Sequence, residues 1–196
     1  MNSSRLAVPV RPLASDFRRS LSIAREFGVR GIEIDGRHGI DLATLSDTGI
    51  RQIRKWLDDA GLHVAAVSFP TRGGYAEQDR LEARVMATKQ AMLQAHRLGA
   101  TVLLGRLGDI PSAEDGTNWQ VLIDVLADLG QTGQQTGALF CAEAGRAGPE
   151  DLQRVIEALP DGSLQVHLVT GALFVHGYDP AEAAMTWAAD IGSVHA

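Results

Sequence analysis

Three residues in the last third of the chain, Glu143, Gly171 and His195, mark the C-terminal ends of successive apolar runs. The runs are ALFCA at 138–142, LQVHLV at 164–169 and IGSV at 191–194. A carboxylate and an imidazole can transfer protons or bind a divalent metal ion. Parallel strands bring their C-terminal ends to one mouth, so we expect Glu143 and His195 to lie there together. Val169 lies between them, where a second acid would complete a metal site.

The elements that must position these residues follow from hydrophobic periodicity, because short apolar runs alternate with longer amphipathic ones, as in repeated βα units. The pattern predicts seven strands and six helices in a single domain, residues 1–196. The strands are expected at 6–10, 31–34, 64–69, 101–104, 138–142, 164–169 and 191–195. The helices are expected at 14–27, 47–60, 79–98, 119–129, 149–159 and 180–189.

An open doubly wound sheet and a barrel both fit this alternation. A dinucleotide-binding sheet would have a Gly-rich turn after its first strand, whereas RPLAS follows here at 11–15. The fold expected is therefore α/β, a (β/α)8 barrel of TIM type. It is incomplete, because the chain ends before an eighth strand. Open edges on the first and seventh strands would favour a homodimer or aggregation.

Composition excludes several classes of protein. With 45% apolar residues, 21% charged residues and a net charge of -6, the chain reads as an acidic globular protein without a nucleic-acid-binding face. No apolar run reaches the length of about 20 residues that a membrane span needs, and no secretory signal is evident, so we expect a cytoplasmic protein. Cys141 is the only cysteine and is expected to be a buried, inert thiol.

Several segments, in order and spacing, resemble the xylose isomerase-like TIM barrels, the sugar phosphate isomerase/epimerase family. They are FGVRGIEID (27–35), LDDAGLHVAAVSFP (57–70), AHRLGATVLLGRLG (95–108), AEAG (142–145), TGALFVHGYDPAEA (170–183) and IGSVHA (191–196). The resemblance implies a sugar or sugar phosphate substrate and a divalent metal ion, Mn²⁺, Mg²⁺, Co²⁺ or Zn²⁺. It also implies proton transfer between adjacent carbons through an enediolate, with the metal as Lewis acid.

The family's metal ligands are Glu, Asp, His and Glu on strands five to eight. Glu143 matches the first and is the implied catalytic carboxylate, and His195 matches the third. Val169 stands where the Asp belongs, Ala172 replaces a frequent Asn or His, and the last Glu would fall beyond Ala196. Because stable sites have three or four protein donors, the resemblance leaves two outcomes open, a metal cofactor or none.

Three further residues are candidates for substrate binding. Asp35 ends the second strand and shares a strand face with Glu33, at a place where the family often carries an acid near the substrate; the carboxylate could instead cap the loop or pair with Arg37. Arg106 follows the fourth strand and could bind a sugar hydroxyl or phosphate, or form a structural salt bridge. His176, in the loop after the sixth strand, could turn toward the site or remain solvated.

Two functions remain open at this stage. The chain is a metal-assisted sugar isomerase or epimerase, or a degenerate barrel that binds a small polyol or sugar without turnover. Phosphodiester cleavage in the style of endonuclease IV is disfavoured, because the chain lacks the His, Asp and Glu set for several zinc ions and a basic surface for DNA.

Overall fold

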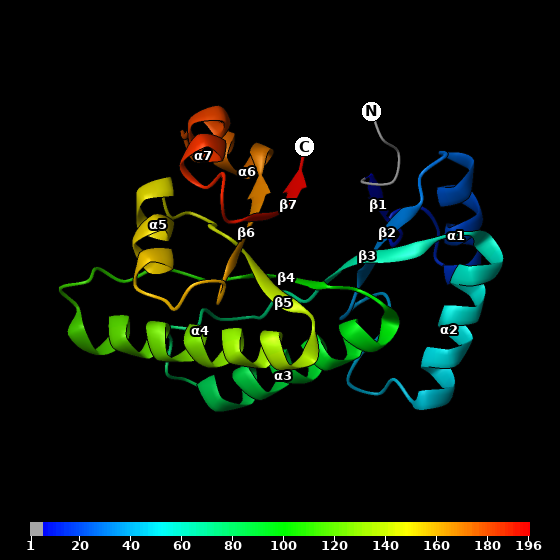
Figure 1. Ribbon diagram of the computed structural model, residues 1–196, viewed down its shortest axis with the longest axis horizontal. Helices are drawn as coiled ribbons and strands as arrows, with labels where there is room; N and C mark the ends of the chain where they lie inside the picture. Colours follow the sequence, from blue (N-terminus) through cyan, green and yellow to red (C-terminus); the bar gives the residue numbers. More distant parts are fainter. Residues whose placement is uncertain (1–5) are drawn as a thin grey trace.

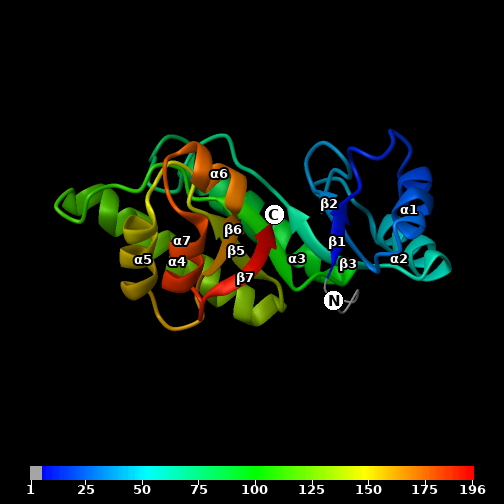
Figure 2. The ribbon, with the colours of Figure 1, turned by 90° about the horizontal axis from the view of Figure 1, so that it is seen from above.

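The computed structural model describes residues 6–196 as one curled sheet surrounded by helices (Figure 1). Its seven strands lie in chain order and every neighbouring pair is parallel. Figure 2 shows the same sheet from above, with β6 and β7 side by side. The strands are β1 (Ala7–Pro9), β2 (Gly31–Asp35), β3 (His63–Ser68), β4 (Val102–Arg106), β5 (Leu139–Glu143), β6 (Gln165–Val169) and β7 (Ile191–His195).

This sequential order confirms the incomplete TIM-type barrel and excludes the doubly wound alternative, whose strand order reverses in the middle of the sheet. All seven predicted strands are present, each shifted by at most two residues at an end. Within the described part of the chain, no pairing joins β1 to β7, so the sheet curls without closing.

The helices lie on the outside of the curled sheet (Figure 1). They are α1 (Phe17–Glu26), α2 (Asp47–Ala60), α3 (Leu81–Leu98), α4 (Gly116–Thr136), α5 (Pro149–Glu157), α6 (Thr170–Val175) and α7 (Pro180–Thr186). The six predicted helices are present, and α6 is one more, a short helix that begins directly after β6. None of the helices in residues 6–196 has the length and hydropathy to cross a membrane.

Helix α4 continues to Thr136, beyond the predicted end at residue 129, although Gly130 and Gly133 lie within it. Close packing explains these glycines. A Cβ at Gly130 would lie 2.5 Å from the Cβ of Ser163, and one at Gly133 would lie 3.0 Å from Leu139. The two glycines therefore let α4 approach the sheet and do not end the helix.

The interior of the curled sheet contains a small apolar cluster beneath the strand ends. It consists of the buried residues Ala66, Leu104 and Cys141, packed against Val102. Leu104 pairs in register with Cys141, and two residues later Arg106 pairs with Glu143. Because side chains alternate along a strand, Arg106 and Glu143 lie on the same face as the cluster, one layer nearer the mouth.

Candidate active site at the strand ends

Glu143 and Arg106 form an ion pair at the C-terminal ends of neighbouring strands. The Arg106 Nε donates to Glu143 Oε2 at 3.0 Å. The Glu143 side chain is only 16% exposed, whereas that of Arg106 is 65% exposed. The carboxylate is thus the inner member of the pair and the guanidinium the outer one. The sequence identified both residues as candidates and allowed a salt bridge for Arg106, but it did not identify the partner. The pairing of Arg106 with Glu143 follows from the register of β4 with β5.

Two histidines occupy the same inner face on β6 and β7. Their ring centroids are 6.4 Å apart, and Val169 pairs in register with His195. His195 is exposed at the end of β7, whereas His167 lies one layer deeper. Burial lowers the pKa of His167, and the nearby His195 adds to this effect, while Glu143 and the Ser193 backbone oppose it. The neutral imidazole is therefore favoured at His167.

Two of the residues that line a small cavity beside Glu143 carry a buried polar atom without a partner. It is lined by Glu143, His167, Val169 and Trp187, together with Ala144, Gly145, Ala172 and Leu173. Within residues 6–196, the buried atoms His167 Nδ1 and Trp187 Nε1 have no hydrogen-bond partner. Trp187 follows α7 and is 1% exposed. Sequence reasoning did not place it near the site, since an apolar helix position gives no signal of a polar cavity.

On the opposite side of the mouth, β2 provides Glu33 and Asp35. Burial raises the pKa of Glu33, and although the Ser68 hydroxyl and His195 lower it, the net direction is upward. Glu33 pairs in register with Ala66 of the interior cluster, so its side chain lies on the inward face of β2. Glu33 is therefore a second acidic group at the mouth. The sequence indicates it only through its position on the same strand face as Asp35.

Asp35 serves the loop that follows β2. Its Oδ1 accepts the backbone N–H groups of Arg37 at 2.9 Å and His38 at 2.8 Å. Its Oδ2 pairs with Arg11 Nη1 at 3.0 Å. Burial opposes the charged form, but these contacts outweigh it and lower the pKa of Asp35. These contacts correspond to the alternative in which Asp35 caps the loop. The arginine that pairs with Asp35 is Arg11, because Arg37 lies over the Phe69 ring.

His176 is exposed just after α6, and its backbone N–H bonds to the carbonyl groups of Ala172 and Leu173. It does not line the cavity beside Glu143. The structure therefore brings Glu143, Arg106, His195 and His167 to one mouth, with Glu33 and Asp35 across from them, and leaves His176 at the surface.

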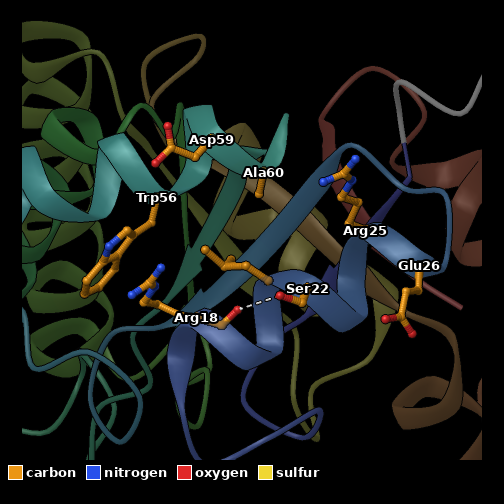
Figure 3. A pocket seen from close by; sticks show the side chains of 8 residues that line it. Arg18, Ser22, Arg25, Glu26, Trp56, Asp59 and Ala60 are labelled. Carbon is orange, nitrogen blue, oxygen red and sulfur yellow. Dashed lines mark hydrogen bonds between the residues drawn. The ribbon is translucent and has the colours of Figure 1, made fainter.

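A larger groove of about 440 Å³ lies elsewhere, between the outer faces of α1 and α2 (Figure 3). Arg18 lies over the Trp56 ring at 5.6 Å, and Ser22 Oγ donates to the Arg18 carbonyl at 3.3 Å. Glu26 and Asp59 balance the charge of Arg18 and Arg25 along this groove. Because it includes no strand end, it lacks the arrangement on which barrel chemistry depends.

The residues present at the mouth do not fit a divalent metal ion. Throughout residues 6–196, no group of three or more His, Cys, Asp or Glu side chains is placed to hold one. Val169 offers no donor between Glu143 and His195, and Glu143 already accepts a hydrogen bond from Arg106. Glu143 and His195, the two residues that match family ligands, fall short by themselves of the three or four donors that stable protein sites use, and no third donor in residues 6–196 is placed to join them.

The curled parallel sheet, with its polar mouth, defines a barrel protein of the TIM class. The family model of the xylose isomerase-like TIM barrel matches residues 21–196, and the chain belongs to this family. No curated protein sequence matches the chain.

Solved structures agree with this family. A xylose isomerase domain protein from Planctomyces limnophilus has a TM-score of 0.83 at 19% identity, over 98% of this chain and 73% of that one. The 3-keto-D-glucoside 4-epimerase from E. coli has a TM-score of 0.79 at 16% identity, over 98% and 78%. A xylose isomerase-like TIM barrel protein from Mycobacterium smegmatis, in complex with magnesium, has a TM-score of 0.78 at 18% identity, over 98% and 74%. At these identities the likeness shows the fold alone.

Proposed function

We propose that this chain is a sugar or sugar phosphate isomerase or epimerase in which Glu143 moves the proton. The observation that carries the proposal is the place of Glu143, a half-buried carboxylate at the end of β5 in the mouth of the barrel. The family and the epimerases among the structural neighbours support this reaction class.

In this reaction Glu143 takes a proton from the carbon beside the substrate's carbonyl group, which gives an enediolate. Return of the proton to the neighbouring carbon, with a proton shift between the two oxygens, gives the isomer. Return of a proton to the same carbon from the other face gives the epimer, and that proton must come from a second acidic group on the opposite side of the substrate, because Glu143 reaches only one face. Arg106, whose Nε lies 3.0 Å from Glu143 Oε2, is the cation proposed to stabilise the oxygen on which negative charge develops. Asp35 and His176 remain proposed substrate contacts from the loops.

No step is assigned to a metal ion, because the donors at the mouth do not fit one. This misfit favours a second candidate, a barrel that binds a sugar or small polyol without turnover. Val169 is its specific support, since the strand position that provides a metal-binding Asp in the family is apolar here.

Deuterium exchange separates the two candidates. The chain is incubated in D₂O with a panel of ketoses and ketose phosphates, and mass spectrometry follows deuterium at the carbon beside the carbonyl. An isomerase or epimerase gives exchange that Glu143→Gln abolishes and Glu150→Gln, at an exposed site on α5, leaves unchanged. Saturable binding without exchange identifies the binding protein, and the absence of both refutes the two candidates together.

A further inference from the structure

Arg106 occupies the part of the mouth where a metal-dependent barrel would hold its cation. It is in register with Glu143, the first of the two family ligands in this chain, and contacts the carboxylate directly. A metal ion bound to Glu143 would compete with this guanidinium for the same oxygen. The ion would also need a donor at Val169, where the chain provides only methyl groups.

The guanidinium needs no such donors, because it is permanently charged and brings its charge to the site on a covalent tether. Only its Nε–H is engaged by a described residue, through Glu143. A guanidinium has five N–H donors in a planar fork, so the four on Nη1 and Nη2 remain for a ligand. The exposure of the side chain, 65%, makes these donors accessible from the mouth.

The direction of the ion pair matters as much as its presence. Glu143 is 16% exposed and lies on the inner side, so the positive end of the pair faces the mouth. The apolar cluster of Ala66, Leu104 and Cys141 lies beneath it on the same face of the sheet. A ligand entering from solvent thus meets a cationic fork whose Nε–H is held by a half-buried carboxylate.

We propose that Arg106 replaces the divalent cation in this barrel and forms, with its Nη groups, a metal-independent site for an oxyanion of the ligand. The class of ligand is a phosphate, a carboxylate or the enediolate oxygen of a sugar. The inference rests on the proposed function only for the sugar itself, since oxyanion and metal binding are measured without turnover.

The test uses the full chain, with inorganic phosphate and Mn²⁺ as separate probes. Side-chain ¹H–¹⁵N spectra follow the Arg106 Nε–H signal, which is assigned by its loss in Arg106→Gln. We expect phosphate to shift this signal saturably in the millimolar range. We expect equimolar Mn²⁺, which broadens nuclei near its binding site, to leave the Arg106 and His195 signals sharp.

Variants test whether phosphate binding depends on the guanidinium of Arg106. Phosphate affinity, measured by calorimetry, should fall about tenfold or more in Arg106→Gln and by a smaller factor in Arg106→Lys, which keeps the charge but not the planar donors. Arg146→Gln is the matched control, because Arg146 is exposed in the loop after β5. Circular dichroism of each variant verifies that it is folded.

Two results would overturn the inference. One is stoichiometric Mn²⁺ binding that broadens His195 and disappears in Glu143→Gln. The other is phosphate affinity that is absent, or that is equal in the wild type and Arg106→Gln. Neither result depends on deuterium exchange. Phosphate binding at Arg106 without deuterium exchange would refute the proposed isomerase and support the oxyanion site. Deuterium exchange that requires Mn²⁺ would support the isomerase and refute the metal-independent site.

Discussion

The Arg106–Glu143 pair is expected to stabilise the fold more than an ordinary surface ion pair does. Two unit charges about 4 Å apart interact by about 1 kcal/mol in water and about 4 kcal/mol at an effective dielectric constant of about 20. Because Arg106 is 65% exposed and Glu143 only 16%, the pair lies between these limits and near the lower one. We expect a coupling free energy of about 1 kcal/mol.

A double-mutant cycle measures this coupling. Urea unfolding of the wild type, Arg106→Gln, Glu143→Gln and the double variant gives four free energies of unfolding. The coupling free energy is the change in the double variant minus the sum of the changes in the two single variants. Lys55 and Asp59 provide a matched control, because they also pair at 3.0 Å but are 67% and 62% exposed on one helix. Their coupling should be about 0.3–0.5 kcal/mol.

High ionic strength further distinguishes the coupling free energies of the two ion pairs. At about 1 M ionic strength the Debye length is about 3 Å, which screens exposed charges more than half-buried ones. The Lys55–Asp59 coupling should become undetectable, while part of the Arg106–Glu143 coupling should persist. If both couplings are equal at low salt and vanish together, Glu143 is not the sheltered anchor that the structure shows, and the assignment of Arg106 as a fixed cation loses its basis.

Three further outcomes are expected. Gly105→Ala should lower the free energy of unfolding by about 1–3 kcal/mol in urea, because its Cβ would lie 2.4 Å from the buried ring of Phe140; an unchanged midpoint would contradict this. Burial opposes the charge of Asp35, but two backbone N–H groups and Arg11 outweigh it and hold the pKa below 3.8. Its stabilisation is therefore present above about pH 4 and lost as the pH falls through the lowered pKa. Asp35→Asn should cost about 1–3 kcal/mol at pH 7 and progressively less as the pH falls through the lowered pKa, measured by chemical denaturation, and a cost that does not change with pH would refute it. Burial raises the pKa of Cys141 to about 12, so Ellman's reagent should react with it only when the protein unfolds, and rapid labelling of the folded chain would show the thiol to be accessible.

The sequence was sufficient for the strands and for the polar residues that end them, because apolar runs and strand ends are local properties. It could not give the partner of Glu143, which depends on the register of β4 against β5. The sequence left the end of α4 open beyond residue 129 because glycine is ambiguous: Gly130 allows close packing against Ser163 and does not terminate the helix. Helix α6 was missed since its six residues, TGALFV, are too few for a helical period to be visible.

The inner face of the barrel changes from apolar to charged between Cys141 and Glu143 on β5, and this change limits where a polar ligand can bind. At Cys141 the surroundings are apolar enough to raise the thiol pKa to about 12, and at Glu143 a carboxylate is paired and in contact with the mouth. The distance between these levels is about 6–7 Å along the strand. A polar ligand gains little by entering the lower level, because Ala66, Leu104 and Cys141 line it and the desolvation of the ligand beside them is costly. Its contacts must therefore come from the last inward residue of each strand and from the loops beyond. On β4 and β5 those residues are Arg106 and Glu143, so the proposed ligand contact and the proposed proton transfer both belong to a single layer of the barrel.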